Sequence, residues 1–295
     1  MRTGFLFDPL YANHLTGPGH PERPERLDAI LGESRDLDLI RIPARDATFE
    51  ELHTVHEEGY PARIRDRIKA GESMLDADTA VSAGSFRAAI RAAGGALALG
   101  EAFHAGRVEA GFACLRPPGH HACRDRAMGF CLFNNAALLA RALSENNHRV
   151  CIVDFDVHHG NGTQDIFEDD PEVGYCSLHE HPLYPGTGSE TETGAGNLLN
   201  IPLPAGSGIE TYRAAFEKRV LPWIEGRAPD VIVLSAGFDA HELDPLARMR
   251  LATNDYATLT RMLATRPVLS LLEGGYDLEA LGGSVQAHLQ ALIEA

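Results

Sequence analysis

Short apolar runs alternate with longer helix-forming stretches along most of the chain, and this alternation restricts the possible folds more than any other feature. Several runs are apolar at nearly every position, which is typical of strands covered on both faces of a parallel sheet. The pattern therefore predicts βαβ units in an α/β fold, with one open, mainly parallel sheet flanked by helices. The predicted strands are residues 4–7, 111–115, 149–155, 173–178, 198–202, 230–235 and 267–272.

Helix-forming stretches separate these runs. Residues 85–103 are rich in Ala and Leu, and residues 134–146 open with two asparagines that suit the N-cap position. Residues 253–266 open with Thr-Asn-Asp, in which the Thr or the Asn would cap the helix and the Asp would lie in its first turn. Pro222 is expected to kink or end its helix. No repeat or low-complexity linker interrupts the pattern, so residues 1–295 are expected to form a single domain.

Composition narrows the class of protein. The chain has 295 residues, of which 44% are hydrophobic, and a formal net charge of −16. Such acidity disfavours a general nucleic-acid-binding surface, whereas a basic substrate such as a histone tail would be attracted. No apolar run is long enough for a signal peptide or a membrane span, so we expect a cytoplasmic location and no membrane partner. The five cysteines are scattered without a C-x-x-C pair, which argues against a disulfide framework or a zinc knuckle.

The segment CIVDFDVHHG, residues 151–160, combines an apolar run with two aspartates and two histidines. In a strand, alternate side chains face the same way, so Asp154, Asp156 and His158 are predicted to share one side. Asp239 ends a second apolar run, VIVLSAGFD, after a flexible glycine. Two aspartates and one histidine would leave metal positions open for water and substrate, as catalytic sites require. The alternative is an aspartate N-cap and a hydrogen-bonded core histidine.

Other loops that follow predicted strands carry residues suited to catalysis. His120 and His121, in RPPGHHA, can carry protons near neutral pH, although a lone pair is as often incidental. Tyr276, in LEGGYD, can donate a hydrogen bond to a developing oxyanion or can simply fill a loop pocket. Phe130 and Tyr184 either wall a narrow apolar tunnel or belong to the core.

Taken in order, the motifs resemble those of the zinc-dependent histone deacetylase superfamily, which includes bacterial acetylpolyamine amidohydrolases and acetoin-utilisation proteins. The resemblance runs from about residue 14 to residue 280 through HPERPERL, RPPGHHA, GFCLFNN, DFDVHHGNGTQ, SLHE…YPGTG, SAGFDAHELDPL and LEGGYDL. It implies the arginase/deacetylase fold, an open, mainly parallel sheet flanked by helices. Asn161 stands where class I members carry aspartate, so the chain looks like a class II-type bacterial member.

The resemblance implies hydrolysis of an acylated amine at one catalytic zinc ion, with ferrous iron as a possible replacement. It implies that Asp156, His158 and Asp239 bind this ion. It implies that His121 acts first as general base and then as general acid, with His120 as its electrostatic and hydrogen-bonding partner.

Further roles follow from the same resemblance. Tyr276 would polarise the substrate carbonyl, and Asn161 would contact His121 as a neutral partner. The implied substrate tunnel consists of Gly129, Phe130, Tyr184, Leu246 and Asp78. A structural potassium site is implied at the Asp154 carboxylate, Ser177 and the carbonyl groups of Asp156, His158 and Leu178. A second cation site is implied around Phe167, Asp170, Val173 and Asn197.

The identity of the substrate depends on one position. Leu246, in ELDPLARM, lies where polyamine-selective members of the family carry an acidic residue. An apolar residue there favours acyl-lysine in proteins or peptides over acetylpolyamines as the substrate. Two alternatives of other classes are an arginase-like dimanganese ureohydrolase and a non-catalytic module that binds acyl-lysine. The sequence leaves the acyl chain length and the oligomeric state open.

Overall fold

The computed structural model describes residues 1–295 and contains one eight-stranded sheet in the order β2-β1-β3-β8-β7-β4-β5-β6. Every neighbouring pair of strands is parallel. The strands are β1 (Thr3–Leu6), β2 (Ile40–Ile42), β3 (Ala110–Ala113), β4 (Val150–Asp154), β5 (Val173–Glu180), β6 (Leu198–Leu203), β7 (Val231–Ala236) and β8 (Val268–Leu272).

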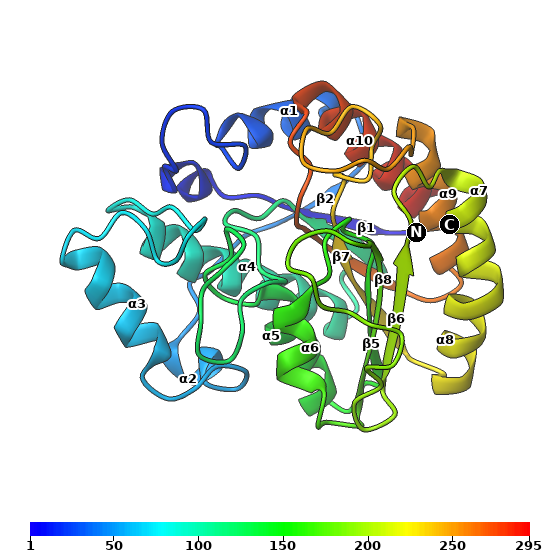
Figure 1. Ribbon diagram of the computed structural model, residues 1–295, viewed down its shortest axis with the longest axis horizontal. Coiled ribbons are helices and arrows are strands. Elements are labelled where there is room, and N and C mark those ends of the chain that lie inside the picture. The colour runs from blue at the N-terminus through cyan, green and yellow to red at the C-terminus, as the bar shows by residue number, and fades with distance from the viewer.

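Helices cover both faces of this sheet. Figure 1 shows α4, α5 and α6 on one side of the sheet and α7 to α10 on the other. The helices are α1 (Glu25–Glu33), α2 (Phe49–Leu52), α3 (Tyr60–Lys69), α4 (Ser85–His104), α5 (Asn135–Glu145), α6 (Asn161–Phe167), α7 (Ile209–Ala215), α8 (Leu221–Arg227), α9 (Thr253–Leu263) and α10 (Leu278–Glu294), with a 3-10 helix η1 (Pro9–Asn13) and a π-helical turn η2 (Phe216–Val220). No helix is long and apolar enough to cross a bilayer.

The predicted parallel sheet flanked by helices is confirmed, and all seven predicted strands are present with ends within two residues of those expected. Sequence analysis missed β2. This edge strand has three residues, of which Ile40 and Arg41 are exposed, so it lacks the apolar run that identifies a buried strand. The central strands β4, β5, β7 and β8 are buried at every residue, as expected for a sheet covered on both faces.

The helix caps and the helix break predicted from the sequence are confirmed only in part. Asn134 caps α5 as predicted, because its side chain accepts a hydrogen bond from the Ala137 N–H. The predicted Thr or Asn cap of α9 is wrong, since the N-cap is Ala252 and its N–H donates to the Asp255 carboxylate at 2.8 Å. Of the two outcomes predicted for Pro222, a kink or the end of the helix, the end is wrong. The chain passes from α7 through the π-helical turn η2 into α8, and Pro222 lies in the first turn of α8.

The topology brings distant segments to one edge of the sheet. Strands β8, β7, β4 and β5 are adjacent and parallel, so their carboxyl ends lie together. Residues 273–276 follow β8, residues 237–250 follow β7 and residues 155–160 follow β4. The tandem histidines follow β3, which borders β8. The chemically distinctive motifs therefore meet at this edge.

Candidate active site and metal centre

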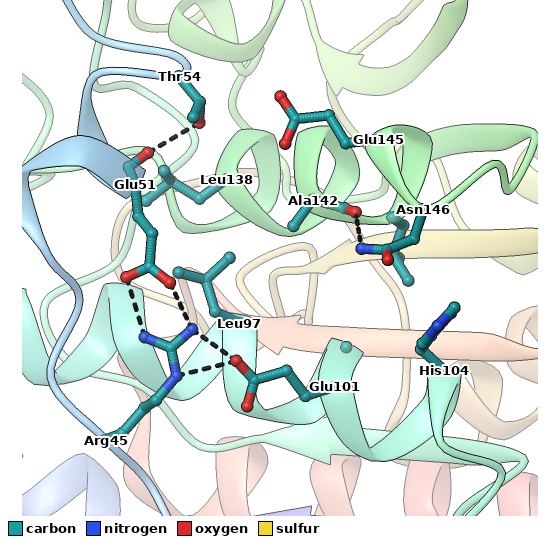
Figure 2. A pocket seen from close by; sticks show the side chains of 12 residues that line it. Arg45, Glu51, Thr54, Leu97, Glu101, His104, Leu138, Ala142, Glu145 and Asn146 are labelled. Atoms are coloured by element: carbon teal, nitrogen blue, oxygen red, sulfur yellow. Dashed lines mark hydrogen bonds and ion pairs between the residues drawn. The ribbon is translucent and has the colours of Figure 1, made fainter.

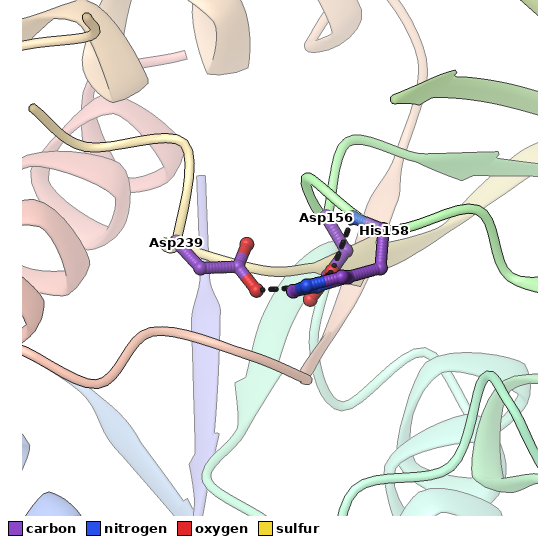
Figure 3. Close-up of side chains that lie close together, drawn as sticks. All are labelled: Asp156, His158 and Asp239. Atoms are coloured by element: carbon purple, nitrogen blue, oxygen red, sulfur yellow. Dashed lines mark hydrogen bonds and ion pairs between the residues drawn. The ribbon is translucent and has the colours of Figure 1, made fainter. Parts of the chain in front are cut away.

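Asp156, His158 and Asp239 converge at the carboxyl edge of the sheet. One ligand atom from each lies within 4.8 Å of the other two. His158 Nδ1 is 3.1 Å from Asp156 Oδ1 and 3.2 Å from Asp239 Oδ2, and Figure 3 shows the imidazole between the two carboxylates. Both carboxylates are fully buried, and burial of two such groups is costly without compensating positive charge. The donor set therefore fits a divalent cation.

The route by which the chain aligns these residues differs from the one predicted. Strand β4 ends at Asp154, so the period-two alternation expected to carry through to His158 is wrong. Two successive side-chain turns replace it. Asp154 Oδ1 accepts the Asp156 N–H at 3.1 Å, and Asp156 Oδ1 accepts the His158 N–H at 2.9 Å. Aspartate forms this type of turn readily, and the repeat of two residues survives in a different backbone.

Two glycines make room for the carboxylates. A Cβ on Gly237 would overlap the Asp156 carboxylate, and a Cβ on Gly274 would overlap the carboxylates of both Asp156 and Asp239. Gly237 thus permits close packing, which corrects its predicted role as a flexible joint. The Gly274 N–H also donates to Asp156 Oδ2 at 2.8 Å. The space and the backbone donors hold the carboxylates in place, which supports the fit of the site to a metal ion.

The two adjacent histidines occupy different environments. His120 Nδ1 lies 3.0 Å from Asp154 Oδ2, and the Tyr175 hydroxyl donates to the same oxygen at 3.1 Å. Burial opposes a charge on His120, but the negative charges of Asp156 and Asp154 outweigh it and raise the pKa of His120 to about 10. His120 is therefore a protonated partner of a buried carboxylate.

His121 has the opposite tendency. Its ring lies 4.0 Å from the His120 ring, centroid to centroid, and its Nδ1 lies 2.8 Å from Asn161 Oδ1, as the resemblance implied. Burial lowers the pKa of His121 well below its usual value, and the positive charge of His120 adds to this effect. Two neighbouring groups with opposite shifts in pKa are typical of paired acid and base roles.

A cavity of about 240 Å³ opens above the metal-ligand cluster. It is lined by every residue that the resemblance assigned to the tunnel, by three residues assigned to chemistry or metal binding, and by Leu183, which the sequence analysis did not single out. These residues are Asp78, Gly129, Phe130, Tyr184, Leu246, His121, His158, Tyr276 and Leu183. The ring centroids of Phe130 and Tyr276 are 6.0 Å apart, and those of Tyr184 and His121 are 5.1 Å apart.

The Gly129–Phe130 turn forms one wall in an unusual backbone conformation. Both residues have positive φ, 57° at Gly129 and 67° at Phe130. A Cβ on Gly129 would overlap the His121 imidazole, so only glycine fits beside that ring. Left-handed backbone at a large aromatic residue is uncommon, and such strain concentrates at functional sites. Asp78 Oδ1 accepts the Gly129 N–H at 3.0 Å and thereby fixes this turn.

Sequence analysis missed a buried polar frame behind the site. Glu273 Oε2 accepts the N–H groups of Gly119 and His120 at 2.7 and 3.1 Å, and burial raises the pKa of Glu273 to about 7. Arg26 donates to the carbonyl oxygens of Glu273 and Gly275 at 2.5 and 2.7 Å. The side chains of Glu273 and Arg26 are fully buried.

A second arginine extends this frame. Arg116 is fully buried and donates both to the Glu22 carboxylate and to the carbonyl oxygens of Tyr11 and His14. Glu22 also accepts from Arg26 at 3.2 Å. Glu22 and Arg26 lie in HPERPERL, Arg116 in RPPGHHA and Glu273 in LEGGYDL, which are motifs that carry the resemblance. Nothing in the sequence, however, indicated which of these residues contact each other.

The two implied cation sites have different surroundings. At the first, Asp154 and Ser177 are register partners on β4 and β5, and Ser177 Oγ lies 2.9 Å from His179 Nδ1. At the second, the carbonyl oxygens of Phe167, Asp170 and Val173 do converge, but they accept hydrogen bonds of 2.7 to 2.9 Å from the Asn197 side-chain amide. The Asn197 amide group thus meets the carbonyl oxygens that the resemblance assigned to a bound cation.

A second cavity lies on another part of the molecule, between α4, α5 and the segment around α2. In Figure 2, Arg45 lies between Glu51 and Glu101, with nitrogen to oxygen distances of 2.6 Å to each. None of the residues assigned to chemistry, metal or tunnel lines this cavity. It belongs to the packing of the helices and does not contribute to the site.

Comparison with known proteins assigns the family. The sequence profile of the histone deacetylase domain matches residues 20–292. The chain belongs to the histone deacetylase family. Its resemblance to this family is thereby confirmed, and it is a hydrolase of the deacetylase type.

Individual family members are similar over nearly the whole chain. Histone deacetylase 15 of Arabidopsis thaliana is 40% identical over 93% of this chain and 53% of its own length. The human protein named polyamine deacetylase HDAC10 is 38% identical over 92% of this chain and 44% of its own length. This chain thus spans about half the length of these two relatives. The crystal structure of the HDA15 HD domain superposes with a TM-score of 0.94 at 38% identity, covering 99% of this chain and 91% of that one.

Proposed function

We propose that this protein removes acetyl or other acyl groups from lysine side chains of proteins or peptides. The observation that carries the proposal is the arrangement of the Asp156–His158–Asp239 cluster, His121 and Tyr276 around one narrow, largely apolar cavity. The cavity suits an aliphatic acyl-lysine chain, and the polar groups gather at its inner end, where the amide would lie.

Asp156, His158 and Asp239 are the proposed ligands of one zinc or ferrous ion. When bound, that ion would supply Lewis-acid polarisation of the acyl carbonyl and a water molecule of lowered pKa. The structure contains one such cluster, whereas a dimanganese ureohydrolase needs ligands for two ions. Metal analysis tests this assignment, since two manganese ions per chain would favour the ureohydrolase.

His121 is the proposed general base. The Asn161 oxygen accepts a hydrogen bond from His121 Nδ1–H, which leaves Nε2 free to take a proton. The low pKa of His121 keeps this nitrogen unprotonated at neutral pH. After proton uptake, His121 becomes the acid that protonates the leaving amine. His120, held by Asp154, supplies a fixed positive charge beside it.

Tyr276 is the proposed oxyanion stabiliser. Burial raises the pKa of its hydroxyl well above the usual value, so the group remains a hydrogen-bond donor throughout the working pH range. A non-catalytic acyl-lysine reader would not require His121 and Tyr276 together at the cavity. A fluorogenic acetyl-lysine peptide, assayed with and without a hydroxamate inhibitor, separates a hydrolase from a reader.

Acyl-lysine is preferred over acetylpolyamine because Leu246 lines the cavity. A carboxylate at this position would attract a polycation, and leucine does not. The human relative named as a polyamine deacetylase makes this the main alternative. Parallel measurement of kcat/KM on acetyl-lysine peptides, N-acetylputrescine and acetylspermidine tests the preference, and much faster turnover of the polyamines would reverse it.

A structural potassium ion is proposed beside the zinc site, at the Asp154 carboxylate, Ser177 and the neighbouring carbonyl groups. The support is the pairing of Asp154 with Ser177 across β4 and β5. Thermal unfolding in matched potassium and tetramethylammonium buffers tests it, because a specific ion raises the unfolding temperature as it is titrated.

A further inference from the structure

Asn161 is the polar partner of the proposed general base, and its amide can face that base in two ways. Its Oδ1 lies 2.8 Å from His121 Nδ1. A neutral imidazole carries one N–H, so the group opposite Nδ1 decides which ring nitrogen holds the hydrogen. An amide oxygen at Nδ1 requires Nδ1–H and leaves Nε2 able to accept a proton. An amide NH2 there would require the other tautomer, in which Nε2 carries the hydrogen and cannot act as a base.

The atoms at the other end of the amide decide between these two orientations. Asn161 Nδ2 lies 3.3 Å from Met128 Sδ and 3.4 Å from Cys123 Sγ. A thioether sulfur carries no hydrogen and can only accept a hydrogen bond. If the amide were turned over, Oδ1 would face this sulfur with no hydrogen between the two atoms. The Met128 thioether therefore favours the orientation in which the NH2 group faces it and the oxygen faces His121.

Cys123 favours the same orientation, although a thiol can donate as well as accept a hydrogen bond. Its S–H is directed to the His121 carbonyl oxygen, 3.6 Å from Sγ, which leaves the sulfur lone pairs for the Asn161 amide. Arg126 also donates to this sulfur, at 3.5 Å. The Cys123 side chain is buried. Each N–H of the Asn161 amide thus meets a sulfur acceptor, and the amide oxygen meets His121.

The turn that forms one wall of the cavity also fixes the position of Met128. The Cys131 N–H donates to the Met128 carbonyl oxygen at 2.9 Å, which closes the turn between them. Within this turn, Gly129 packs so closely on His121 that a Cβ would overlap the imidazole. The same turn therefore carries both the wall beside His121 and the sulfur that meets Asn161.

We infer that Met128, assisted by Cys123, sets the tautomer of His121 by orienting the Asn161 amide. Met128 is a positioning residue for the proposed deacylation, because it does not line the cavity and acts through Asn161. The inference deepens the proposed function and rests on it, since it explains how the general base keeps Nε2 free of hydrogen.

The test exchanges the acceptor at position 128 for a donor and for a second acceptor in the zinc-loaded full-length protein. Met128→Lys presents only donors and Met128→Glu only acceptors, and both keep an unbranched chain. Met128→Lys should turn the amide over and convert His121 to the Nε2–H tautomer, so that kcat falls about a hundredfold while KM changes about twofold or less. Met128→Glu should keep the Nδ1–H tautomer and a kcat within about threefold of the wild type.

Two measurements are made on each protein. Nitrogen NMR of protein labelled in its histidines reports which ring nitrogen of His121 carries the hydrogen, and the signal is assigned by its absence from His121→Ala. Steady-state kinetics on a fluorogenic acetyl-lysine peptide give kcat and KM. If Met128 merely fills space, Met128→Lys and Met128→Glu should keep the same tautomer and lose activity alike, and that result overturns the inference.

The double variant Cys123→Ala/Met128→Leu provides the answer if a charged side chain at position 128 prevents folding. It removes both sulfur acceptors with little change in volume, and the Nε2–H tautomer of His121 should then become detectable. His121 entirely in the Nδ1–H form in this variant overturns the inference. The tautomer is measured without substrate, so failure of the wild type to hydrolyse the peptide counts against the proposed function alone.

Discussion

The Arg26 guanidinium lies 5.1 Å from the centroid of the Tyr276 ring, behind the proposed oxyanion donor. The same guanidinium donates to the carbonyl oxygens of Gly275 and Glu273 and so fixes the two residues on either side of Gly274. Arg26 comes from α1, near the opposite end of the chain. The position of Tyr276 is therefore set by a long-range contact as well as by its own loop.

Removal of the Tyr276 hydroxyl tests its role directly. The Tyr276→Phe variant should lose about two to three decades in kcat, as expected for loss of one oxyanion donor, while it binds metal in the same ratio as the wild type. Steady-state kinetics and metal analysis on the same preparation provide the measurement. Turnover close to that of the wild type would remove Tyr276 from the proposed mechanism.

The Arg26 contact makes a second prediction. Arg26→Lys keeps the positive charge but cannot reach both carbonyl oxygens in the fork geometry of a guanidinium. We expect kcat to fall about tenfold or more because Tyr276 is no longer held in place, with the metal content unchanged. If the variant instead loses metal along with activity, Arg26 supports the whole site and does not specifically position Tyr276.

The glycine beside the metal ligands makes a third prediction. A Cβ at Gly237 would overlap the Asp156 carboxylate, so Gly237→Ala should displace that carboxylate and weaken metal binding by tenfold or more. Gly226→Ala in α8 is the matched control, because the added methyl meets nothing within 4 Å. Competition with a chelator of known affinity measures both. Equal metal affinity in the two variants would mean that the site tolerates the displacement.

The pH dependence of stability gives a fourth prediction through His288. Burial lowers the pKa of His288 to about 3, whereas an unfolded histidine titrates near 6.5. As the pH falls, the unfolded chain takes up a proton first, so the stability associated with neutral His288 is present above about pH 6.5 and is lost toward pH 3. Between pH 7.5 and 5.5, the wild type should lose about 1.4 kcal/mol more unfolding free energy than His288→Gln.

Urea unfolding at the two pH values measures this difference. The other histidines are the same in both proteins, so their titration cancels in the comparison. Identical slopes for wild type and His288→Gln would show that His288 takes up its proton in the folded state.

The sequence predicted the central sheet because its strands are buried and apolar throughout, and it missed β2 because an exposed strand of three residues carries no such pattern. The cluster of Asp156, His158 and Asp239 was predicted from strand ends, although the backbone that aligns it is a pair of aspartate turns. Local pattern and local chemistry were sufficient for these features.

The buried polar frame behind the site could not be predicted from the sequence, because its contacts join residues that are far apart along the chain. The Arg116–Glu22 and Glu273–Gly119 contacts join residues 94 and 154 positions apart, and no local period marks such contacts. The carbonyl groups that meet the Asn197 amide likewise come together only in three dimensions. A single sequence does not specify which buried charges pair with each other.

The separation in sequence between the proposed metal ligands has a consequence for folding. Asp156 and His158 follow β4, and Asp239 follows β7. An ion bound to all three would therefore connect two strands that pair in space but are separated along the chain by β5, β6, three α-helices and the π-helical turn η2. Because these three ligands come together only in the folded chain, binding of the ion favours the folded state over the unfolded one. The ion would then link these two strands reversibly, in a protein whose five cysteines form no disulfide.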